Sequence, residues 1–342
     1  MLSEAPVLGL LGWNEHFRTE FEPHEPLGRE PGRVATQHRG VYVLATAEGE
    51  VEARITGRLR FDGDLPAVGD WVAHSGGLIH AVLPRRSAFV RRAAGNETAE
   101  QVLAANIDTA FLVMAFYRDL NPRRLERYLA LAWESGADPA IVLTKLDLAE
   151  DADAAIAEVE SVAIGVPVHP VSAVTGEGLE ELEPYLGPGR TVVLLGSSGV
   201  GKSTLVNALL GEERQATKEI RAFDGRGRHT TTARELIALP GGGLVLDTPG
   251  VRELQLWDAG EGMAGTFADV DELALTCRFS DCSHESEPGC AVRDVVDPHR
   301  LESWRKLRRE LRHLEIKQDA RARSEARKEW RRFTKSMRKS AW

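Results

Sequence analysis

The sequence predicts a multidomain α/β chain in three parts: an N-terminal β-barrel with a short extension (1–95), a central α/β domain (96–255) and a C-terminal metal-binding domain with basic helices (256–342). Three observations predict this division. Short β-like runs fill the first ninety residues, strands and helices alternate from about Asn106, and every cysteine lies between Cys277 and Cys290.

Composition limits the classes of protein to consider. The 342 residues are enough for two or three domains with separate cores, and 42% hydrophobic with 28% charged residues is typical of soluble globular proteins. No apolar run approaches the roughly 20 residues needed to cross a bilayer. The start, "MLSEAPVLGLLGW", lacks the basic region of a secretory signal. Three clustered cysteines favour thiols and metal over disulfides, so we expect a cytoplasmic protein.

The N-terminal β-like runs are "RGVYVLAT", "EVEARITGRLRF", "GDWVAHS" and "LIHAVLP", separated by Gly-rich and acidic turns. Regularly spaced short strands predict a small barrel of OB-like or SH3-like type. Such barrels often bind nucleic acid, although a fold alone does not establish function. The segment "PRRSAFVRR" ends the barrel with four arginines, which either form a solvated edge or meet phosphate.

The central domain alternates apolar strands ("DTAFLVMAF", "PAIVLTKLDL", "RTVVLLG") with helices ("NPRRLERYLALAWESG", "DADAAIAEVESVAIG"). This alternation predicts a parallel sheet covered by helices on both faces. Ligands of such sheets bind at the carboxyl ends of the strands. Four motifs fall at these ends: "TKLD", "VSA", "GSSGVGKS" and "DTPG".

The segment "GSSGVGKST" matches the phosphate-binding loop pattern and has the strand before it and the helix after it that this loop requires. Its glycines let backbone N–H groups converge on phosphate. Lys202 is expected to reach the β- and γ-phosphates, and Ser203 to ligate Mg²⁺. The predicted binding residues are Gly196, Ser197, Ser198, Gly199, Val200, Gly201, Lys202, Ser203 and Thr204.

Two further motifs are predicted to complete the phosphate side. In "LVLDTPG", Asp247 is placed to hold Mg²⁺ and the Gly250 N–H to sense the γ-phosphate. The Gly- and Arg-rich stretch "FDGRGRHTTTARE" has the mobility of a switch loop and offers one threonine hydroxyl to the metal. The candidates are Thr231 and its neighbours Thr230 and Thr232, and the alternative is a simple strand start.

The segment "TKLD", Thr144, Lys145, Leu146 and Asp147, is predicted to read guanine. A carboxylate accepts from guanine N1–H and its exocyclic amine, a pattern that adenine does not present. In "VSA", Ser172 and Ala173 would present a backbone N–H to guanine O6.

These base-reading loops precede the phosphate loop, which reverses the order usual in GTPases. A circular permutation produces this order without changing the site in space. As a hypothesis, "DTPG" then leads directly into the next domain, so that γ-phosphate loss pulls on that domain.

The segment "CRFSDCSHESEPGC" places Cys277, Cys282, His284 and Cys290 in a pattern that predicts one tetrahedral Zn²⁺. Four protein ligands leave no open position, so the metal is expected to be structural. After it, Leu301, Trp304, Leu307, Leu311 and Leu314 follow helical spacing.

The C-terminal region is strongly basic. Residues 300–342 contain sixteen Lys/Arg and six Asp/Glu, a net charge of +10. Because the whole chain has a net charge of −9, the residues before Arg300 have a net charge of −19. Such a block is either a solvated helix face or a contact for RNA phosphates. With a barrel at the other end of the chain, RNA binding is the favoured interpretation.

A barrel, a permuted GTPase domain and a Cys₃His module in this order resemble the ribosome small-subunit-dependent GTPase A (RsgA/YjeQ) family. "GSSGVGKS", "GRHTTT", "DTPGVRE" and "DCSHESEPGCAV" carry the resemblance. It implies a monomeric late-stage assembly factor that binds GTP, the 30S subunit and its 16S rRNA, and leaves after hydrolysis to GDP and phosphate. Thr144 replaces the commoner Asn of this family.

Val251 follows "DTPG" where many GTPases carry a water-orienting Gln, so hydrolysis is expected to be slow without 30S subunits. His229 is the candidate substitute for positioning water, and its alternative is a surface histidine. Two other functions stay open: an RNA-binding module in which nucleotide only gates affinity, and a P-loop kinase or ATPase, which "TKLD" with "VSA" disfavours.

Overall fold

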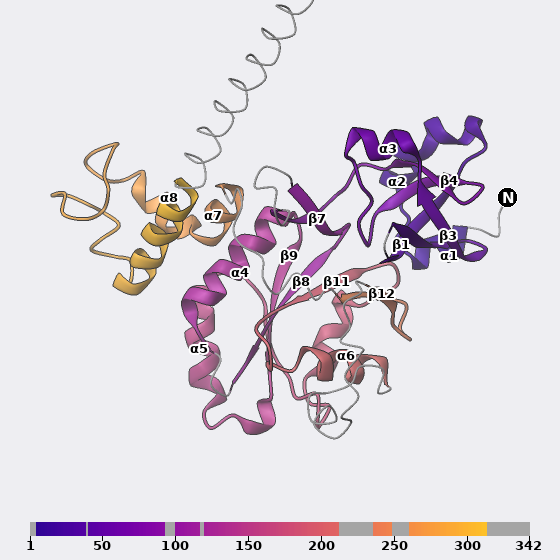
Figure 1. The fold of residues 1–342 in the computed structure, drawn as a ribbon. Coiled ribbons are helices and arrows are strands. Elements are labelled where there is room, and N and C mark those ends of the chain that lie inside the picture. The colour runs from indigo at the N-terminus through magenta and orange to yellow at the C-terminus, as the bar shows by residue number, and fades with distance from the viewer. Residues whose placement is uncertain are drawn as a thin grey trace, which may run out of the picture.

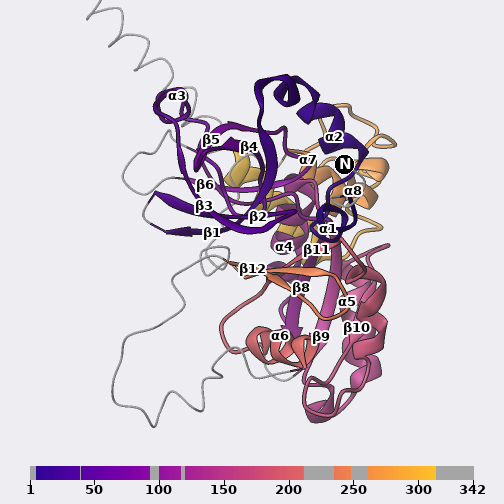
Figure 2. The same ribbon diagram turned by 90° about the vertical axis from the view of Figure 1, so that its right-hand side faces the viewer.

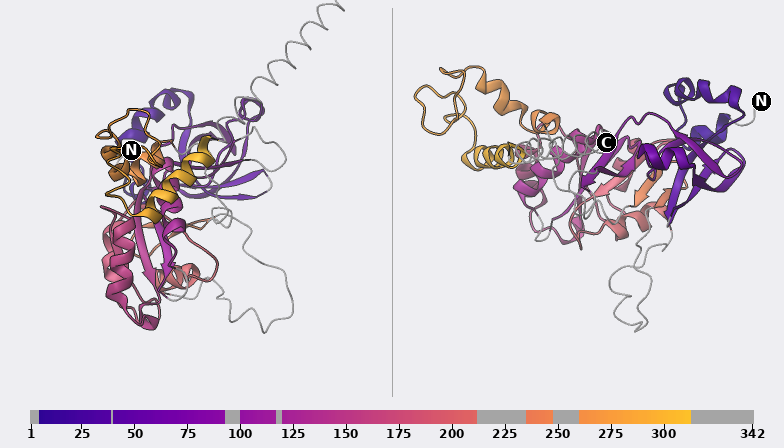
Figure 3. Two further views of the ribbon diagram at one scale, coloured as in Figure 1. Left: turned by 90° about the vertical axis from the view of Figure 1, so that its left-hand side faces the viewer. Right: turned by 45° about the horizontal axis from the view of Figure 1, so that its top comes forward.

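The computed structural model describes residues 5–38, 40–92, 100–116, 120–211, 235–247 and 260–312. The barrel and the C-terminal module lie at opposite ends of the central α/β domain (Figures 1 and 3). Within these residues, no helix combines the length and the apolar character that a bilayer crossing demands.

The barrel consists of β1 (Glu30–His38), β2 (Val41–Thr46), β3 (Gly49–Ile55), β4 (Trp71–Ser75) and β5 (Leu78–Val82). The strands pair in the order β1-β2-β3-β5-β4, and β4 pairs again with β1 through Gly32 and Val72. This second pairing closes the sheet on itself, and β3 and β5 run parallel. The predicted OB-like barrel is confirmed.

The prediction that the run "EVEARITGRLRF" is β-like throughout is wrong for its second half. Strand β3 ends at Ile55, and Gly57–Asp62 form helix α3. The Thr56 hydroxyl accepts the Leu59 N–H and so caps the helix start, and Gly63 ends it in the left-handed conformation. A local cap therefore overrides the strand propensity of this segment.

Three short N-terminal helices were not predicted: α1 (Ala5–Leu10), α2 (Glu15–Phe21) and the 3₁₀ helix η1 (Glu22–Leu27). They lie beside the barrel (Figure 2). Phe17 and Phe21 are buried there, and the rings of Trp13 and Trp71 meet edge-on with centroids 4.7 Å apart. This aromatic cluster attaches the extension to the outside of β4.

In the described residues of the central domain, six strands form a sheet in the order β10-β9-β8-β11-β13-β12. Their bounds are β8 (Thr109–Ala115), β9 (Asp138–Thr144), β10 (Val168–Pro170), β11 (Thr191–Leu195), β12 (Glu235–Ala238) and β13 (Leu244–Asp247). All neighbouring pairs are parallel except β12 with β13. The predicted parallel arrangement is thus confirmed, with an antiparallel strand at one side.

Helices cover both faces of this sheet, as predicted (Figure 1). One face carries α4 (Pro122–Ser135) and α5 (Ala152–Val162), and the other carries α6 (Lys202–Leu210) and the 3₁₀ helix η3 (Leu179–Tyr185). A further 3₁₀ turn, η2, spans Leu146–Leu148. Helix α4 ends at Gly136 in the left-handed conformation, where the sequence predicted its stop.

The central sheet continues into the barrel. Strand β12 pairs with β1 through Glu235 and Thr36, so the described strands of the two parts form one sheet of eleven strands. The connection between the parts also includes a separate two-stranded sheet of β6 (Ala88–Arg92) and β7 (Glu100–Ala105).

The described part of the C-terminal module contains α7 (Gly260–Thr266), α8 (Ala268–Ala274) and a helix over residues 298–312. Leu301, Trp304 and Leu307 of this helix are buried, and Leu311 packs against the same core. The predicted apolar face is therefore confirmed in this range, while Leu314 lies outside the described residues. Helix α7 packs along α4.

Candidate nucleotide site and metal centre

The phosphate loop joins the end of β11, at Leu195, to the start of α6, at Lys202. A Cβ atom on Gly196 would lie 2.3 Å from the Val113 carbonyl oxygen, so only glycine fits there. Lys202 is 8% exposed, and its ammonium donates to the carbonyl oxygens of Gly196 (2.7 Å) and Ser197 (2.5 Å). The loop thus curls around its own lysine at the carboxyl edge of the sheet.

Among the remaining predicted loop residues, Val200 is buried, Ser198 and Gly199 are exposed, and Gly201, Ser203 and Thr204 are half-buried. Gly199 and Gly201 have φ values of 90° and 97°, in the left-handed region that favours glycine. These positive φ angles and the exposed middle of the loop are compatible with an anion cradle, which needs backbone N–H groups that converge on one point.

The first two residues of "TKLD" contact the phosphate loop. Thr144 is buried, and its hydroxyl faces the carbonyl oxygens of Met114 (3.1 Å) and Val200 (2.5 Å). Lys145 has a φ of 62° and donates from Nζ to the Gly199 carbonyl oxygen at 2.9 Å. Two segments about fifty residues apart in the chain therefore form one surface.

The last residue of "TKLD" contacts the "VSA" loop. The Ser172 hydroxyl donates to Asp147 Oδ1 at 2.6 Å, and the Leu146 N–H donates to the Val171 carbonyl oxygen at 3.1 Å. Ser172 is fully buried, whereas Asp147 is exposed and Ala173 is half-buried. The carboxylate is thus held from behind while its open side faces outward, as a base-reading group requires.

Part of the predicted site lies outside the described residues. It comprises Thr230, Thr231, Thr232, His229 and Gly250, together with Val251. The backbone of Asp247 ends β13, which runs parallel to β11, so this residue stands at the same edge of the sheet as the phosphate loop. Ser203 in the first turn of α6 and Asp247 at this edge are compatible with a shared Mg²⁺ ion.

The four predicted zinc ligands come together. The ligand atoms of Cys277, Cys282, His284 and Cys290 lie within 4.8 Å of one another. His284 Nδ1 is 3.6 Å from Cys277 Sγ and 3.4 Å from Cys290 Sγ. Tetrahedral Zn²⁺ with bonds of about 2.0–2.3 Å separates its ligands by about 3.5–3.8 Å, so the donor set fits one zinc ion.

The surroundings of His284 favour metal binding. Burial, reinforced by the Arg308 guanidinium, lowers the pKa of this imidazole below its ordinary value, and the neutral form is the one that ligates metal. The His284 ring also packs against Trp304 at an interplanar angle of 59°, with ring centroids 5.4 Å apart. The cysteine and histidine cluster is therefore fastened to the helix over residues 298–312.

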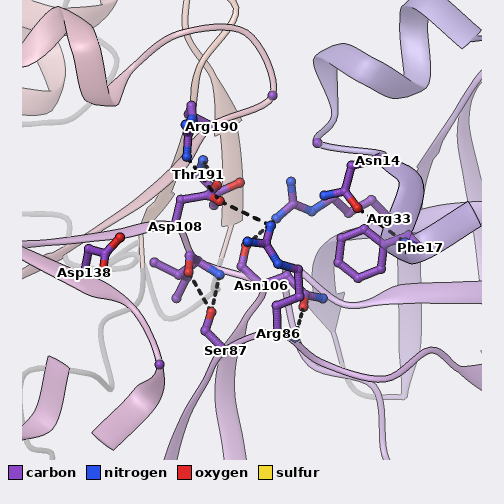
Figure 4. Close-up of a pocket in the computed structure, with 14 residues that line it drawn as sticks. Asn14, Phe17, Arg33, Arg86, Ser87, Asn106, Asp108, Asp138, Arg190 and Thr191 are labelled. Atoms are coloured by element: carbon purple, nitrogen blue, oxygen red, sulfur yellow. Dashed lines mark hydrogen bonds and ion pairs between the residues drawn. The ribbon is translucent and has the colours of Figure 1, made fainter. Parts of the chain in front are cut away.

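A polar crevice of about 130 Å³ lies at the opposite, amino-terminal edge of the strands and was not predicted (Figure 4). It separates the barrel from the central domain. Arg33 is fully buried there and donates to the carbonyl oxygens of Leu11 (2.5 Å), Gly69 (3.2 Å) and Asn106 (2.9 Å). Burial lowers the pKa of this arginine to about 10.

Asp108 organises the other side of the crevice (Figure 4). Its carboxylate accepts the Thr191 N–H at 2.8 Å and pairs with Arg86 at 3.6 Å and Arg190 at 3.9 Å. These contacts tie the starts of β8 and β11 to the barrel, so the crevice is a joint between domains and lies away from the phosphate loop. Its only sequence signal is an arginine inside an apolar strand run, "GRVAT".

Comparisons with known proteins agree with this geometry. The family model described as RsgA GTPase matches residues 82–257. A protein of Opitutus terrae named "Small ribosomal subunit biogenesis GTPase RsgA" is 52% identical, with 89% of each chain covered. One of the same name from Streptomyces coelicolor is 48% identical, with 96% of this chain and 93% of that protein covered.

Two solved structures share the fold over most of this chain. The crystal structure of YjeQ from Thermotoga maritima superimposes with a TM-score of 0.63 at 29% identity, covering 83% of this chain and 98% of that one. YloQ, described as a circularly permuted GTPase, shares the fold with a TM-score of 0.60 and covers 83% of this chain. On these matches and on its permuted site, the chain belongs to the RsgA GTPase family.

Proposed function

We propose that the protein hydrolyses GTP to GDP and phosphate while bound to the 30S ribosomal subunit, and that it acts as a late-stage maturation factor released by hydrolysis. GTP hydrolysis follows from membership of the RsgA GTPase family. The observation that carries the nucleotide assignment is the contact of base-reading and phosphate-binding segments in reversed chain order, through Thr144 and Lys145. Ser172 joins the second base-reading segment to Asp147 of the first.

On the phosphate side, the residues of this chain have separate tasks. The backbone N–H groups from Gly196 to Thr204 hold the phosphate oxygens. The Lys202 ammonium has three N–H donors, so it keeps the carbonyl oxygens of Gly196 and Ser197 and directs its remaining donor to the β- and γ-phosphates. Mg²⁺ would be held by Ser203, Asp247 and one of the switch threonines, and it supplies charge neutralisation on the phosphates. The Gly250 N–H would donate a hydrogen bond to the γ-phosphate and so distinguish GTP from GDP.

On the base side, the exposed Asp147 carboxylate accepts from guanine N1–H and the exocyclic amine. The Lys145 stem lies along the base plane, and the backbone N–H of Ala173 donates to O6. Adenine offers an acceptor at N1 and an amine in place of O6, so it leaves Asp147 and Ala173 without partners.

The zinc ion has a structural task. The group Cys277, Cys282, His284 and Cys290 would saturate its four positions and hold the C-terminal module in shape. The division into 1–95, 96–255 and 256–342 remains part of this proposal.

The ribosomal part of the proposal rests on the relatives named for small ribosomal subunit biogenesis. The OB-like barrel and the basic residues after Arg300 are the elements suited to contact 16S rRNA, because clustered cations release counterions from phosphate. A cytoplasmic monomer that has no membrane partner fits this role.

The experiment compares GTP turnover of the purified protein alone, with 30S subunits and with 50S subunits, using ATP as the control nucleotide. Stimulation by 30S subunits alone, and of GTP alone, supports the proposal. Tight GTP binding with unstimulated turnover and nucleotide-dependent affinity for 30S subunits would support the alternative of a nucleotide-gated RNA-binding module.

His229 is the proposed water-positioning residue, because Val251 cannot orient water by hydrogen bonding. Replacing it, His229→Ala, is expected to abolish 30S-stimulated turnover while GTP affinity stays near that of the wild type. Unchanged stimulated turnover would remove His229 from the mechanism.

A further inference from the structure

The first turns of helix α4 carry charged side chains with different partners. Arg123 pairs with Glu302 at 2.6 Å, and Arg127 pairs with Glu310. Both partners belong to the helix over residues 298–312 of the C-terminal module. Arg124, between them in sequence, turns elsewhere: its Nη1 donates to the Ser197 hydroxyl in the phosphate loop at 3.2 Å.

The position of Arg124 is built by the fold. Helix α4 follows β8, and β8 lies beside β11, whose Leu195 pairs with Leu112. The Asn121 side chain caps α4 by accepting the Arg124 N–H at 3.1 Å. The start of the helix is thereby fixed next to the phosphate loop, and the half-buried Arg124 side chain has a short path to it.

Ser197 is a sensitive point of that loop. Its carbonyl oxygen and that of Gly196 both accept hydrogen bonds from Lys202 Nζ, at 2.5 Å and 2.7 Å. A guanidinium that holds the Ser197 hydroxyl therefore also fixes the segment on which the phosphate-binding lysine rests. Because phosphoryl transfer is catalysed mainly by positioned charge, a small displacement of Lys202 lowers the rate steeply.

We propose that Arg124 is a positioning residue for GTP hydrolysis, which acts through Ser197 to hold the start of the phosphate loop and thereby Lys202. This inference rests on the proposed function. Loss of Arg124 should destabilise the transition state of hydrolysis, because Lys202 interacts with the charge that develops on the γ-phosphate. Binding of GDP depends more on the base-reading loops and on the later N–H groups of the loop, so it should change little.

The test uses the full-length protein and the variants Arg124→Ala, Ser197→Ala, their combination and Arg124→Lys. The readouts are kcat with saturating GTP, with and without 30S subunits, and the Kd for GDP. Arg124→Ala is expected to lower kcat about 10- to 100-fold, with the GDP Kd changed less than about twofold. This loss is smaller than the about 100- to 1,000-fold cost of removing a donor that contacts the reacting group, because Arg124 acts through Ser197. Arg124→Lys should recover part of this loss.

The combination of the two alanine variants gives the decisive comparison. If Arg124 acts through Ser197, the kcat of the double variant falls no further than that of the more impaired single variant. Arg123→Ala is the matched control, because it removes the same charge from the same helix turn but contacts Glu302, and its kcat should stay within about twofold of wild type.

Three results would overturn the inference. The first is a kcat of Arg124→Ala within twofold of wild type, and the second is additive losses of kcat in the double variant. The third is a parallel loss of kcat, GDP binding and Tm, which marks a merely structural side chain. Ser197→Ala provides the same test if Arg124→Ala fails to fold. A wild-type protein that does not turn over GTP under any of these conditions would instead contradict the proposed function, so the two failures are distinguishable.

Discussion

The Ser172 hydroxyl donates a hydrogen bond of 2.6 Å to Asp147 Oδ1, which joins the "VSA" and "TKLD" segments behind the proposed guanine pocket. Ser172 is fully buried and Asp147 is exposed, so the donor side of this bond is sheltered from water. A charge-assisted bond of this kind fixes the direction in which the carboxylate presents its other oxygen. The carboxylate that we propose reads guanine is therefore oriented in the absence of nucleotide.

Replacing this serine, Ser172→Ala, should weaken GTP binding. The carboxylate would lose its orienting donor, and the loss of a hydrogen bond to a charged group corresponds to about 1.5–3 kcal/mol, or roughly a 10- to 150-fold higher Kd. Titration with a fluorescent GTP analogue measures this Kd. Ser161→Ala on α5 is the control, because its hydroxyl donates to the Glu158 carbonyl oxygen of its own helix, away from Asp147. Equal Kd values for both variants would contradict the assigned role.

Thr144 offers one hydroxyl hydrogen to two carbonyl oxygens, those of Met114 and Val200. The change Thr144→Val keeps the shape and removes the donor, so we expect GTP affinity to fall about 5- to 10-fold, from about 1 kcal/mol of lost hydrogen bonding. The amide of Thr144→Asn has two N–H groups and can serve both carbonyls. The GTP affinity of Thr144→Asn should equal or exceed that of wild type. Isothermal titration compares wild type, Thr144→Val and Thr144→Asn.

Zinc removal should unfold the C-terminal module and leave the nucleotide site in place. The change Cys290→Ser removes a ligand that is 2% exposed and packed in the core. We expect the metal content to fall from about one zinc per chain toward zero and the first thermal transition to move down. Elemental analysis and calorimetry measure these, with the exposed Ser286→Ala as the control. The assignment would be contradicted if wild-type protein contained no zinc after purification.

The interface between α4 and the C-terminal module should respond to pH through Glu126. This residue is 1% exposed and lies 3.5 Å from Arg300, and burial raises the pKa of its carboxyl above the ordinary value of 4.5 despite the opposing effects of Ser303 and Arg300. The folded state then binds a proton more readily than the unfolded state. The contribution of Glu126 to stability therefore decreases as pH rises from about 4.5 through the folded-state pKa.

The variant Glu126→Gln tests this relationship, because it keeps the size of the side chain and cannot ionise. Its free energy of unfolding relative to wild type should increase with pH across that window, as measured by urea denaturation at several pH values. The exposed interface glutamate variant Glu302→Gln serves as the control and should keep the wild-type slope. A constant difference between Glu126→Gln and wild type would contradict the prediction.

The features that could be predicted from the sequence are those encoded in short windows. The apolar run before "GSSGVGKST" and the helix pattern after it place that loop at the carboxyl edge, and the same argument brings Thr144 and Asp147 to that edge. The cysteine spacing likewise places Cys290 near the other zinc ligands. Each of these conclusions needs only a local pattern and the geometry of a parallel sheet.

The features that were missed depend on contacts between distant segments. Arg33 meets carbonyl oxygens of Leu11, Gly69 and Asn106, which no local pattern connects. Helices α1 and α2 have six and seven residues, too few to show a helical period, and they form because Trp13 packs on Trp71. The bond from Arg124 to Ser197 also depends on which strands are neighbours in the sheet.

The central claim is that segments in reversed chain order form one guanine-nucleotide site, and the most direct measurement is nucleotide competition in wild type and Asp147→Asn. Labelled GTP is displaced by GTP, ATP and xanthosine triphosphate. Xanthine carries a carbonyl where guanine has its amine, so the Asn amide can donate to it. We predict that wild type prefers GTP over ATP and that Asp147→Asn prefers xanthosine triphosphate. A variant that still prefers GTP would contradict the permuted site.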